Sequence, residues 1–213
     1  PSKNVPRGTF SAKHGVNRCK NTIQSLRRAA LKKRIPRRGD CARRHLWEVM
    51  IVKDIDELNA NVFELFNKDW ALLTAGSIGD YNAMTIGWGQ LGTLWNKSGV
   101  TVFVKPVRYT HGFMEANEYF TVGFYPQEYR RDLMILGSKS GRDGDKVALT
   151  HLTPRAVEHG VTFAQAKLTL ICKKIYRHDM ELANIPADAA KAYYAEEAPH
   201  TIYIGEVVGF VES

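Results

Sequence analysis

The sequence has few cysteines and no long apolar run. Its 213 residues include three cysteines, Cys19, Cys41 and Cys172, which form neither a C-x-x-C pair nor an even set for disulfide bonds. No stretch reaches the roughly 18 consecutive apolar residues of a membrane-spanning helix, and the N-terminal residues lack the apolar core of a secretory signal. We therefore expect a protein of a reduced, cytoplasmic compartment with no membrane partner, in which Cys172 is a small core residue.

Acidic residues are almost missing from the first quarter of the chain. Residues 1–49 contain 14 lysines and arginines but only two acids, a net charge of +12. The remaining residues contain 16 basic and 20 acidic residues, a net charge of −4. Because large apolar residues are also sparse in residues 1–49, we expect a basic, disordered extension there and a folded domain over residues 50–213. A nucleic-acid-binding tail or a targeting segment is the alternative; we do not expect nucleic acid as a partner.

The folded part is rich in predicted strands. Asp54 and Glu57 have the spacing of a capping box, and the apolar residues that follow predict a first helix with Ile55, Leu58, Val62, Leu65 and Phe66 on one face. Strands are predicted over residues 70–75, 83–88, 100–104, 119–125, 166–176 and 201–211, and short helices after His111, after Pro126 and over residues 186–194. This order favours a mainly β protein, a barrel with short helices, over a doubly wound sheet.

The sequence contains the glycine pattern of a dinucleotide-binding motif, but not the structural context that this motif requires. The run from Gly87 to Gly92 spells G-x-G-x-x-G, but the motif must open a helix and be followed by an acid about 20 residues later. The residues after Gly92 lack a helical period, and no acid occurs before Glu115. We therefore reject a Rossmann domain and expect these glycines to allow a tight bend or a close approach.

Four segments carry side chains suited to a ligand. Lys105, Arg108, Tyr109 and Thr110 lie between a strand and a helix, with Thr110 as the expected N-cap, which describes an anion site. The loop of residues 137–144 adds hydroxyls and cations at Ser138, Ser140 and Arg142. The run Asn82-Ala83-Met84-Thr85 enters a strand with small polar residues that suit the edge of a planar ring, and His200 stands just before the last strand. Each segment taken alone also fits an ordinary solvated loop, a capped helix or a core strand.

No other catalytic arrangement can be picked out. His111, His151, His159 and His178 have no paired spacing that suggests a metal, and no serine–histidine–acid set is evident. We expect neither a metal centre nor a hydrolase.

Taken in order, these segments resemble the flavin reductase-like, FMN-binding split-barrel family, especially its flavoredoxin-type branch. The resemblance covers about residues 54–211 and lies in residues 70–76, 82–88, 104–110, 137–143 and 200–207. It implies a split β-barrel, a homodimer with FMN near the subunit interface, and hydride transfer from NADH or NADPH to an unknown electron acceptor.

The resemblance also assigns residues. It implies that Asn82, Ala83, Met84 and Thr85 line the isoalloxazine ring, that His200 is near the ring or the nicotinamide, and that the ribityl and phosphate groups are held by Lys105, Arg108, Tyr109, Thr110, Ser138, Ser140 and Arg142. No catalytic acid or base is required, because the flavin carries the hydride chemistry. A non-catalytic FMN electron carrier or flavin store uses the same pocket and remains the alternative function.

Overall fold

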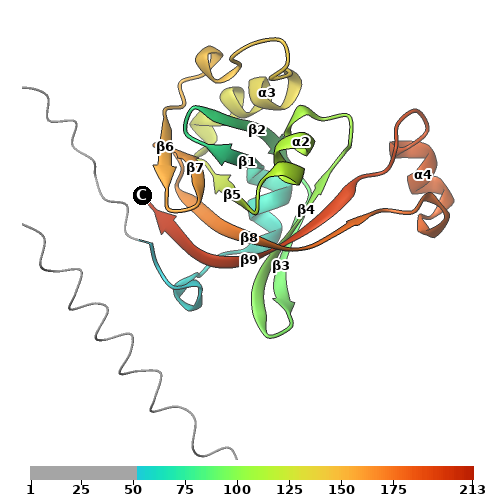
Figure 1. Cartoon of the computed structure of the whole chain (residues 1–213), viewed down its shortest axis with the longest axis horizontal. Coiled ribbons are helices and arrows are strands. Elements are labelled where there is room, and N and C mark those ends of the chain that lie inside the picture. Colours follow the sequence, from blue (N-terminus) through green and yellow to red (C-terminus); the bar gives the residue numbers. More distant parts are fainter. Residues whose placement is uncertain (1–51) are drawn as a thin grey trace, which may run out of the picture. The chain divides into compact units, whose positions relative to one another are not determined.

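The computed structural model describes residues 52–213, and the expectations for residues 1–49, for Cys19 and Cys41 and for a domain start at residue 50 lie outside that range. Nine strands and several short helices make up the described part (Figure 1). The strands are β1 (Ala71–Ser77), β2 (Asp80–Ile86), β3 (Gly89–Leu94), β4 (Lys97–Val104), β5 (Tyr119–Phe124), β6 (Pro154–Val157), β7 (Gly160–Phe163), β8 (Leu168–Asp179) and β9 (Thr201–Glu212). The helices are η1 (Ile55–Glu57), η2 (Glu64–Asp69), α2 (Tyr109–Ala116), η3 (Gln127–Tyr129), α3 (Arg130–Ser138), η4 (Val147–Leu149), η5 (Leu182–Asn184) and α4 (Ala187–Tyr193).

Seven strands form one antiparallel sheet in the order β2-β1-β5-β8-β9-β4-β3, and β6 and β7 form a separate hairpin. Within the described residues β2 and β3 are the two edges of this sheet, so it is a split barrel and the predicted mainly β fold is confirmed. The central strands β8 and β9 are paired along most of their length, with register shifts after Ile171 and Lys174. Such irregularities raise the local twist, which lets long strands curve around a core.

The core contains apolar side chains from both sides of the sheet. The main cluster includes Phe120, Phe124, Tyr203 and Phe210, all almost fully buried. A second cluster lies beneath α3, where Leu72 of β1 contacts side chains of the helix and of the β7 segment. Cys172 is fully buried, and burial raises the pKa of its thiol, so its predicted role as a core residue is confirmed.

One local prediction was wrong, and two elements were not predicted. The apolar residues after Asp54 do not form one helix; a 3₁₀ turn (η1) is followed by the π-helix η2, the Asp54 carboxylate accepts from the amide of Asp56, and the amide of Glu57 donates to the backbone carbonyl of Asp54. The strand β3, which pairs with β4 in a hairpin, was not predicted, whereas β4 agrees with the strand predicted over residues 100–104. The β6–β7 hairpin was not predicted, because its strands are only four residues long and carry little periodicity.

Rejection of the dinucleotide fold is supported by this hairpin. The glycine motif connects β2 to β3, and no helix follows it. A Cβ atom built on Gly89 would lie 2.2 Å from Cε1 of Phe66, so this glycine allows the core ring of η2 to approach the strand. No helix in residues 52–213 is long and apolar enough to cross a membrane.

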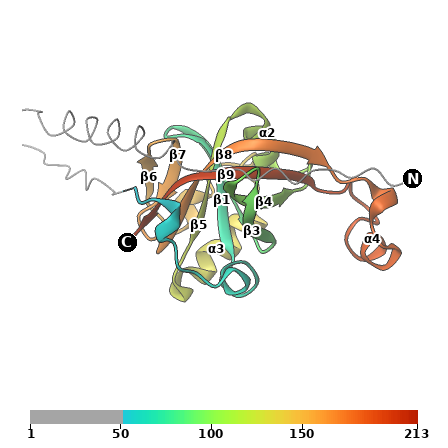
Figure 2. The same ribbon diagram turned by 90° about the horizontal axis from the view of Figure 1, so that it is seen from below.

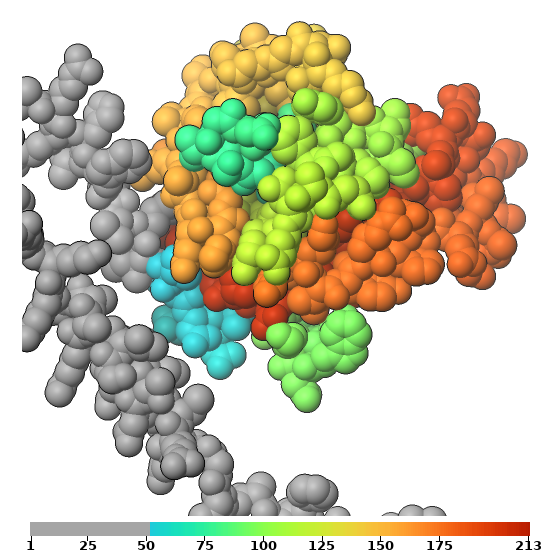
Figure 3. Space-filling model, viewed as in Figure 1, coloured from blue at the N-terminus to red at the C-terminus, as the bar shows by residue number. Residues whose placement is uncertain are grey.

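Two parts project from the barrel, and one of them, the segment between β8 and β9, contributes residues to the site. The segment between β8 and β9, with α4, extends from one end of the two long strands, and a second view shows the same projection (Figures 1 and 2). In the space-filling view this segment, which we call the lobe, forms the right-hand side of the domain and is continuous with it, and the tip of the β3–β4 hairpin protrudes at the bottom (Figure 3). The segment leaves the sheet at the end of β8 and returns to it at the start of β9, so these two paired strands fix both of its ends.

Candidate functional site

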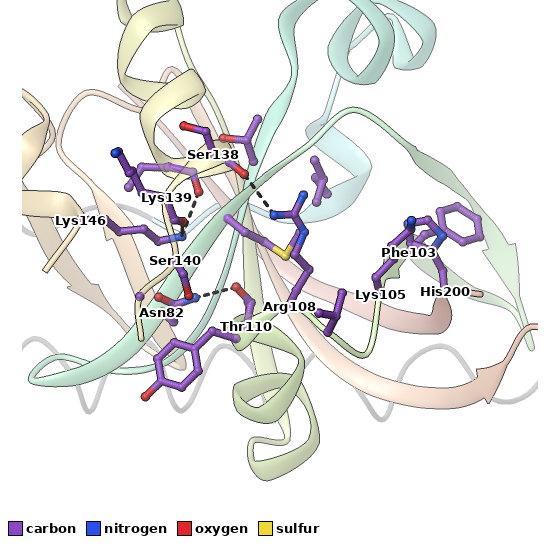
Figure 4. A pocket seen from close by; sticks show the side chains of 18 of the residues that line it. Asn82, Phe103, Lys105, Arg108, Thr110, Ser138, Lys139, Ser140, Lys146 and His200 are labelled. Atoms are coloured by element: carbon purple, nitrogen blue, oxygen red, sulfur yellow. Dashed lines mark hydrogen bonds between the residues drawn. The ribbon is translucent and has the colours of Figure 1, made fainter. Parts of the chain in front are cut away.

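A cavity of about 570 Å³ lies between the end of β2, the turn before α2, the loop after α3 and the lobe between β8 and β9. All but one of the predicted site residues line it, namely Asn82, Met84, Thr85, Lys105, Arg108, Tyr109, Thr110, Ser138, Ser140, Arg142 and His200. Figure 4 shows Lys105, Phe103 and His200 on one side, Asn82, Thr110, Ser140 and Lys146 on the other, and Arg108 between them. The fold therefore brings together segments that are more than a hundred residues apart in sequence.

Ala83 is the exception among the predicted residues. Its side chain is 1% exposed and packs in the second core cluster beneath α3. Successive side chains of a strand point to opposite faces, so with Asn82 and Met84 at the cavity the methyl group of Ala83 points away from it. Ala83 is accordingly not among the residues that line the cavity.

The start of α2 differs from the prediction. Arg108 occupies the N-cap position without a side-chain capping bond, and Thr110 lies inside the first turn of the helix. The predicted N-cap role of Thr110 was therefore wrong. Its buried hydroxyl instead accepts a hydrogen bond from Nδ2 of Asn82, with 2.6 Å between the two atoms (Figure 4). This bond joins β2 to α2 at the floor of the cavity.

The loop after α3 approaches this floor very closely. A Cβ atom on Gly141 would lie 2.3 Å from Oδ1 of Asn82 and 2.9 Å from Cδ1 of Tyr109. Any larger residue at this position would force Asn82, Tyr109 or the loop itself to move, so glycine allows the loop to close against β2 and α2 as observed.

Two arginines connect the two loops that face each other across the cavity. Nη1 of Arg108 donates to the carbonyl oxygen of Gly137 over 3.3 Å, and Nη1 of Arg142 donates to that of Val107 over 3.0 Å. The Arg142 guanidinium also lies 5.1 Å from the ring centre of Tyr109, within the range of a cation–π contact. Both arginines are paired with carbonyls rather than carboxylates in these contacts, so their charge is not neutralised by them.

The two serines form hydrogen bonds within α3 and the loop that follows it. Oγ of Ser138 donates to the carbonyl of Met134, one turn earlier in α3, and Oγ of Ser140 accepts from the amide of Arg142. The Thr85 hydroxyl donates to the carbonyl of Leu133. These hydroxyls line the cavity, and each holds a segment of its wall in place.

Lys146 is a lining residue that was not predicted from the sequence. It is 6% exposed, lines the cavity, and its Nζ donates to the carbonyls of Leu136 at 2.9 Å and Lys139 at 3.2 Å. Burial, and then the nearby positive charge of Arg108, lower the pKa of its ammonium group from 10.5 to about 8. No ion pair between Lys146 and an acid is found in residues 52–213. A buried cation without a counter-ion indicates a place for an anion.

The side of the cavity near the lobe is close to electrically neutral. Nζ of Lys105 lies 2.6 Å from Oε2 of Glu197 and also donates to the carbonyl of Tyr193. Burial, followed by the positive charges of Lys105 and Arg108, lowers the pKa of His200 to about 4, so the ring is neutral near pH 7. Nδ1 of His200 lies 2.9 Å from the hydroxyl of Tyr194.

Trp88 is a second residue that was not predicted as part of the site. Its indole is 46% exposed, lines the cavity, and lies 5.1 Å from the ring of Tyr193 and 5.3 Å from that of His200. The cavity thus has a cationic wall, formed by Arg108, Lys139, Arg142 and Lys146, and an aromatic wall. A planar molecule that carries an anionic group fits both walls. Within the described residues no group of three or more histidine, cysteine or acidic side chains could hold a metal ion.

Comparisons with known proteins agree with this description. The model of the Flavin reductase like domain family matches residues 63–213. No curated protein sequence matches the chain.

Solved structures share the fold at low identity. A flavoredoxin from Methanosarcina acetivorans is 20% identical, with 74% of each chain covered and a TM-score of 0.54. An FMN-binding protein from Thermus thermophilus with bound p-hydroxybenzaldehyde is 17% identical, with 85% of this chain and 82% of that one covered and a TM-score of 0.53. An NADH:FAD oxidoreductase from Streptomyces globisporus, in complex with NAD and FAD fragments, is 16% identical, with 68% and 74% covered and a TM-score of 0.52.

Proposed function

Because the chain belongs to the Flavin reductase like domain family, we propose that it binds FMN in the cavity between Asn82 and His200 and passes electrons from NADH or NADPH to an acceptor. The observation that carries the proposal is the pairing of a cationic wall with an aromatic wall in one cavity. FMN has the matching parts, a phosphate at one end and a flat ring system at the other.

The phosphate end of the ligand is assigned to the cationic wall. Arg108 and Arg142 each use Nη1 to bind a backbone carbonyl of the facing segment, and their other guanidinium N–H groups can donate to a phosphate. Lys146 adds a buried ammonium group on the same wall. Guanidinium and ammonium groups form charge-assisted hydrogen bonds with phosphate, roughly twice as strong as neutral ones. Lys105, Tyr109, Thr110, Ser138 and Ser140 complete the set proposed for the ribityl and phosphate groups.

The ring end is assigned to the β2 side of the cavity. Asn82, Met84 and Thr85 line that side, with Trp88 at its end. When bound, FMN supplies the hydride and electron transfer, so the protein needs to position the ring and exclude water rather than provide an acid or base. His200, neutral near pH 7, would face the nicotinamide without repelling its positive charge after hydride loss.

The proposal includes NADH or NADPH as donor and a homodimer with FMN near its interface. The complex of the Streptomyces globisporus oxidoreductase with NAD and FAD fragments supports a nicotinamide donor. The flavoredoxin among the structures that share this fold favours a second function, an FMN electron carrier with little turnover of its own. Adding NADH or NADPH to the FMN-loaded protein under nitrogen separates the two, since rapid bleaching of the flavin absorbance supports the reductase and slow bleaching supports the carrier.

Binding of FMN is tested with Arg108→Ala. Removing a charge-assisted donor should weaken FMN by about 1.5–3 kcal/mol, about 10- to 150-fold, whereas riboflavin, which lacks the phosphate, should bind both proteins equally. Fluorescence titration measures both ligands. Arg131→Ala, an exposed arginine of α3 that does not line the cavity, is the matched control and should change neither affinity. Absence of flavin binding by the unaltered protein at micromolar concentration would overturn the proposal, and equal losses for FMN and riboflavin would remove the phosphate role of Arg108.

A further inference from the structure

A second cavity, of about 920 Å³, lies on the other side of Trp88. Its walls are the residues around η2, the start of β3 and the lobe between β8 and β9. It shares four residues with the cavity described above, Gly87, Trp88, Phe103 and Tyr193. The two hollows are therefore adjacent parts of one depression, and we call the second one the apolar groove.

The apolar groove differs in chemistry from its neighbour. No lysine, arginine, aspartate or glutamate is among the residues that line it. Phe63 at its edge is 86% exposed, and Leu91, Ile185 and Tyr193 add further apolar surface. The polar side chains of its lining are uncharged: three amides, Asn67, Gln90 and Asn184, with the indole of Trp88 and the hydroxyls of Tyr193 and Tyr194.

A lining of this kind disfavours charged ligands. Moving a charged group out of water costs several kcal/mol unless a counter-charge compensates it, and the groove offers none. Amide groups can donate to a carbonyl oxygen, so an apolar molecule with one or two carbonyls loses little on entry. The volume lies within the range of small-molecule sites, about 300–1,000 Å³.

The junction between the two hollows is also uncharged. Trp88 and Tyr193 meet there edge to face, with ring centres 5.1 Å apart and planes at 90°. On the side of the first cavity next to the lobe, Lys105 is paired with Glu197, and the His200 ring is neutral near pH 7. The residues common to the two hollows are a glycine and three aromatic residues, so a ligand in the groove meets no charged side chain at the junction.

We propose that the apolar groove binds an uncharged, planar ring compound of the quinone class, which is the electron acceptor of the protein. The proposal rests on the proposed function, because the groove adjoins the place assigned to FMN. Reduction of a quinone to the hydroquinone takes two electrons and two protons. The nicotinamide nucleotide supplies both electrons and one proton as a hydride, and water supplies the second proton.

The test compares two naphthoquinones that differ in charge. Equilibrium dialysis of the full-length protein, with and without FMN, measures binding of 2-methyl-1,4-naphthoquinone and of 1,4-naphthoquinone-2-sulfonate. We expect the uncharged compound to bind at least about tenfold more tightly, a difference of 1.4 kcal/mol, with FMN present or absent.

Two variants locate the binding. Ala189→Glu places a charge on the α4 wall, and Phe63→Ser removes exposed apolar surface; each should weaken the uncharged quinone at least about fivefold and leave the FMN affinity unchanged. Ile78→Ser, at the turn between β1 and β2, removes an exposed side chain that lines neither cavity and should change nothing.

The outcomes separate the two proposals. Equal affinity for the two quinones, or equal effects of Phe63→Ser and Ile78→Ser, overturns the assignment of the groove while FMN binding still stands. Failure of FMN to bind, with the quinone still selective and sensitive to Ala189→Glu, overturns the proposed function and leaves the groove as a quinone site. If Phe63→Ser instead converts a dimer to a monomer in sedimentation and leaves quinone binding intact, the groove is covered by a second copy of the chain.

Discussion

The two ends of the depression around Trp88 are built in different ways. The cationic end is formed by two loops that hydrogen bonds from Arg108 and Arg142 to backbone carbonyls hold together. The apolar groove is formed by side chains that are left exposed on η2, β3 and the lobe, with Phe63 as the most exposed of them. The charged end therefore depends on accurate backbone positions, whereas the apolar end depends on the surface that its side chains offer.

This difference determines how each end tolerates change. A hydrogen-bonded loop loses function when one close contact is forced apart, because several donors move together. An apolar surface loses affinity roughly in proportion to the area removed. Substitutions in the cationic end should thus have large and specific effects, and substitutions in the apolar groove smaller and graded ones.

The largest effect is expected from Gly141→Ala. The added methyl group would lie 2.3 Å from Oδ1 of Asn82, and the loop should move to relieve this overlap, which otherwise costs about 1–3 kcal/mol. Because FMN binds the original loop geometry, restoring that geometry on binding costs a similar free energy, so FMN affinity should fall about 5- to 150-fold. Gly112→Ala in α2 is the matched control, because nothing lies within 4 Å of its added methyl group. The control should bind FMN normally and melt at the same or a higher temperature. If Gly141→Ala binds FMN as well as the control does, the cationic end does not depend on accurate backbone positions.

The next effect concerns the protonation of Lys146. Its ammonium has a pKa of about 8 in the folded protein without ligand, so an anion that needs the charge should bind about tenfold more weakly at pH 9 than at pH 7. Lys146→Met should bind FMN weakly at both pH values. The quinone in the apolar groove should show no such pH dependence in either protein.

Stability of the ligand-free protein should respond to pH in the opposite direction. Because the folded pKa of Lys146 lies below its ordinary value of 10.5, the unfolded chain binds the proton more tightly between these two values. The free energy of unfolding, compared with that of Lys146→Met, should therefore rise as the pH rises from about 8. Chemical denaturation at several pH values measures this, and a difference that stays constant would mean that Lys146 keeps an ordinary pKa.

The smallest effect is expected from removal of residues 1–49. This segment has a net charge of +12 and few large apolar residues, so we expect it to contribute little to the folded domain. FMN and quinone affinities at physiological salt should stay within about twofold, and only FMN association at low salt should slow, because salt screens the attraction of a basic segment for phosphate. Loss of FMN at physiological salt would show that the folded domain begins before residue 50.

Most strands could be predicted from the sequence because each is a local pattern. The runs that form β1, β5, β8 and β9 are rich in apolar and β-branched residues, and their predicted centres agree with the structure. The first helix failed because spacing on one face cannot distinguish an α-helix from a short 3₁₀ turn followed by a π-helix.

By itself, the sequence determined the class of fold, the charge difference between residues 1–49 and the rest, and eleven of the lining residues of the cavity, since these follow from composition and from short motifs. Only the tertiary structure placed Lys146 beside Arg108, Trp88 beside Tyr193 and His200, and Gly141 against Asn82. These contacts join residues that are distant along the chain, and local patterns carry no information about which distant residues will meet. The low pKa of Lys146 has the same origin, because burial and a neighbouring charge exist only once the loops have closed.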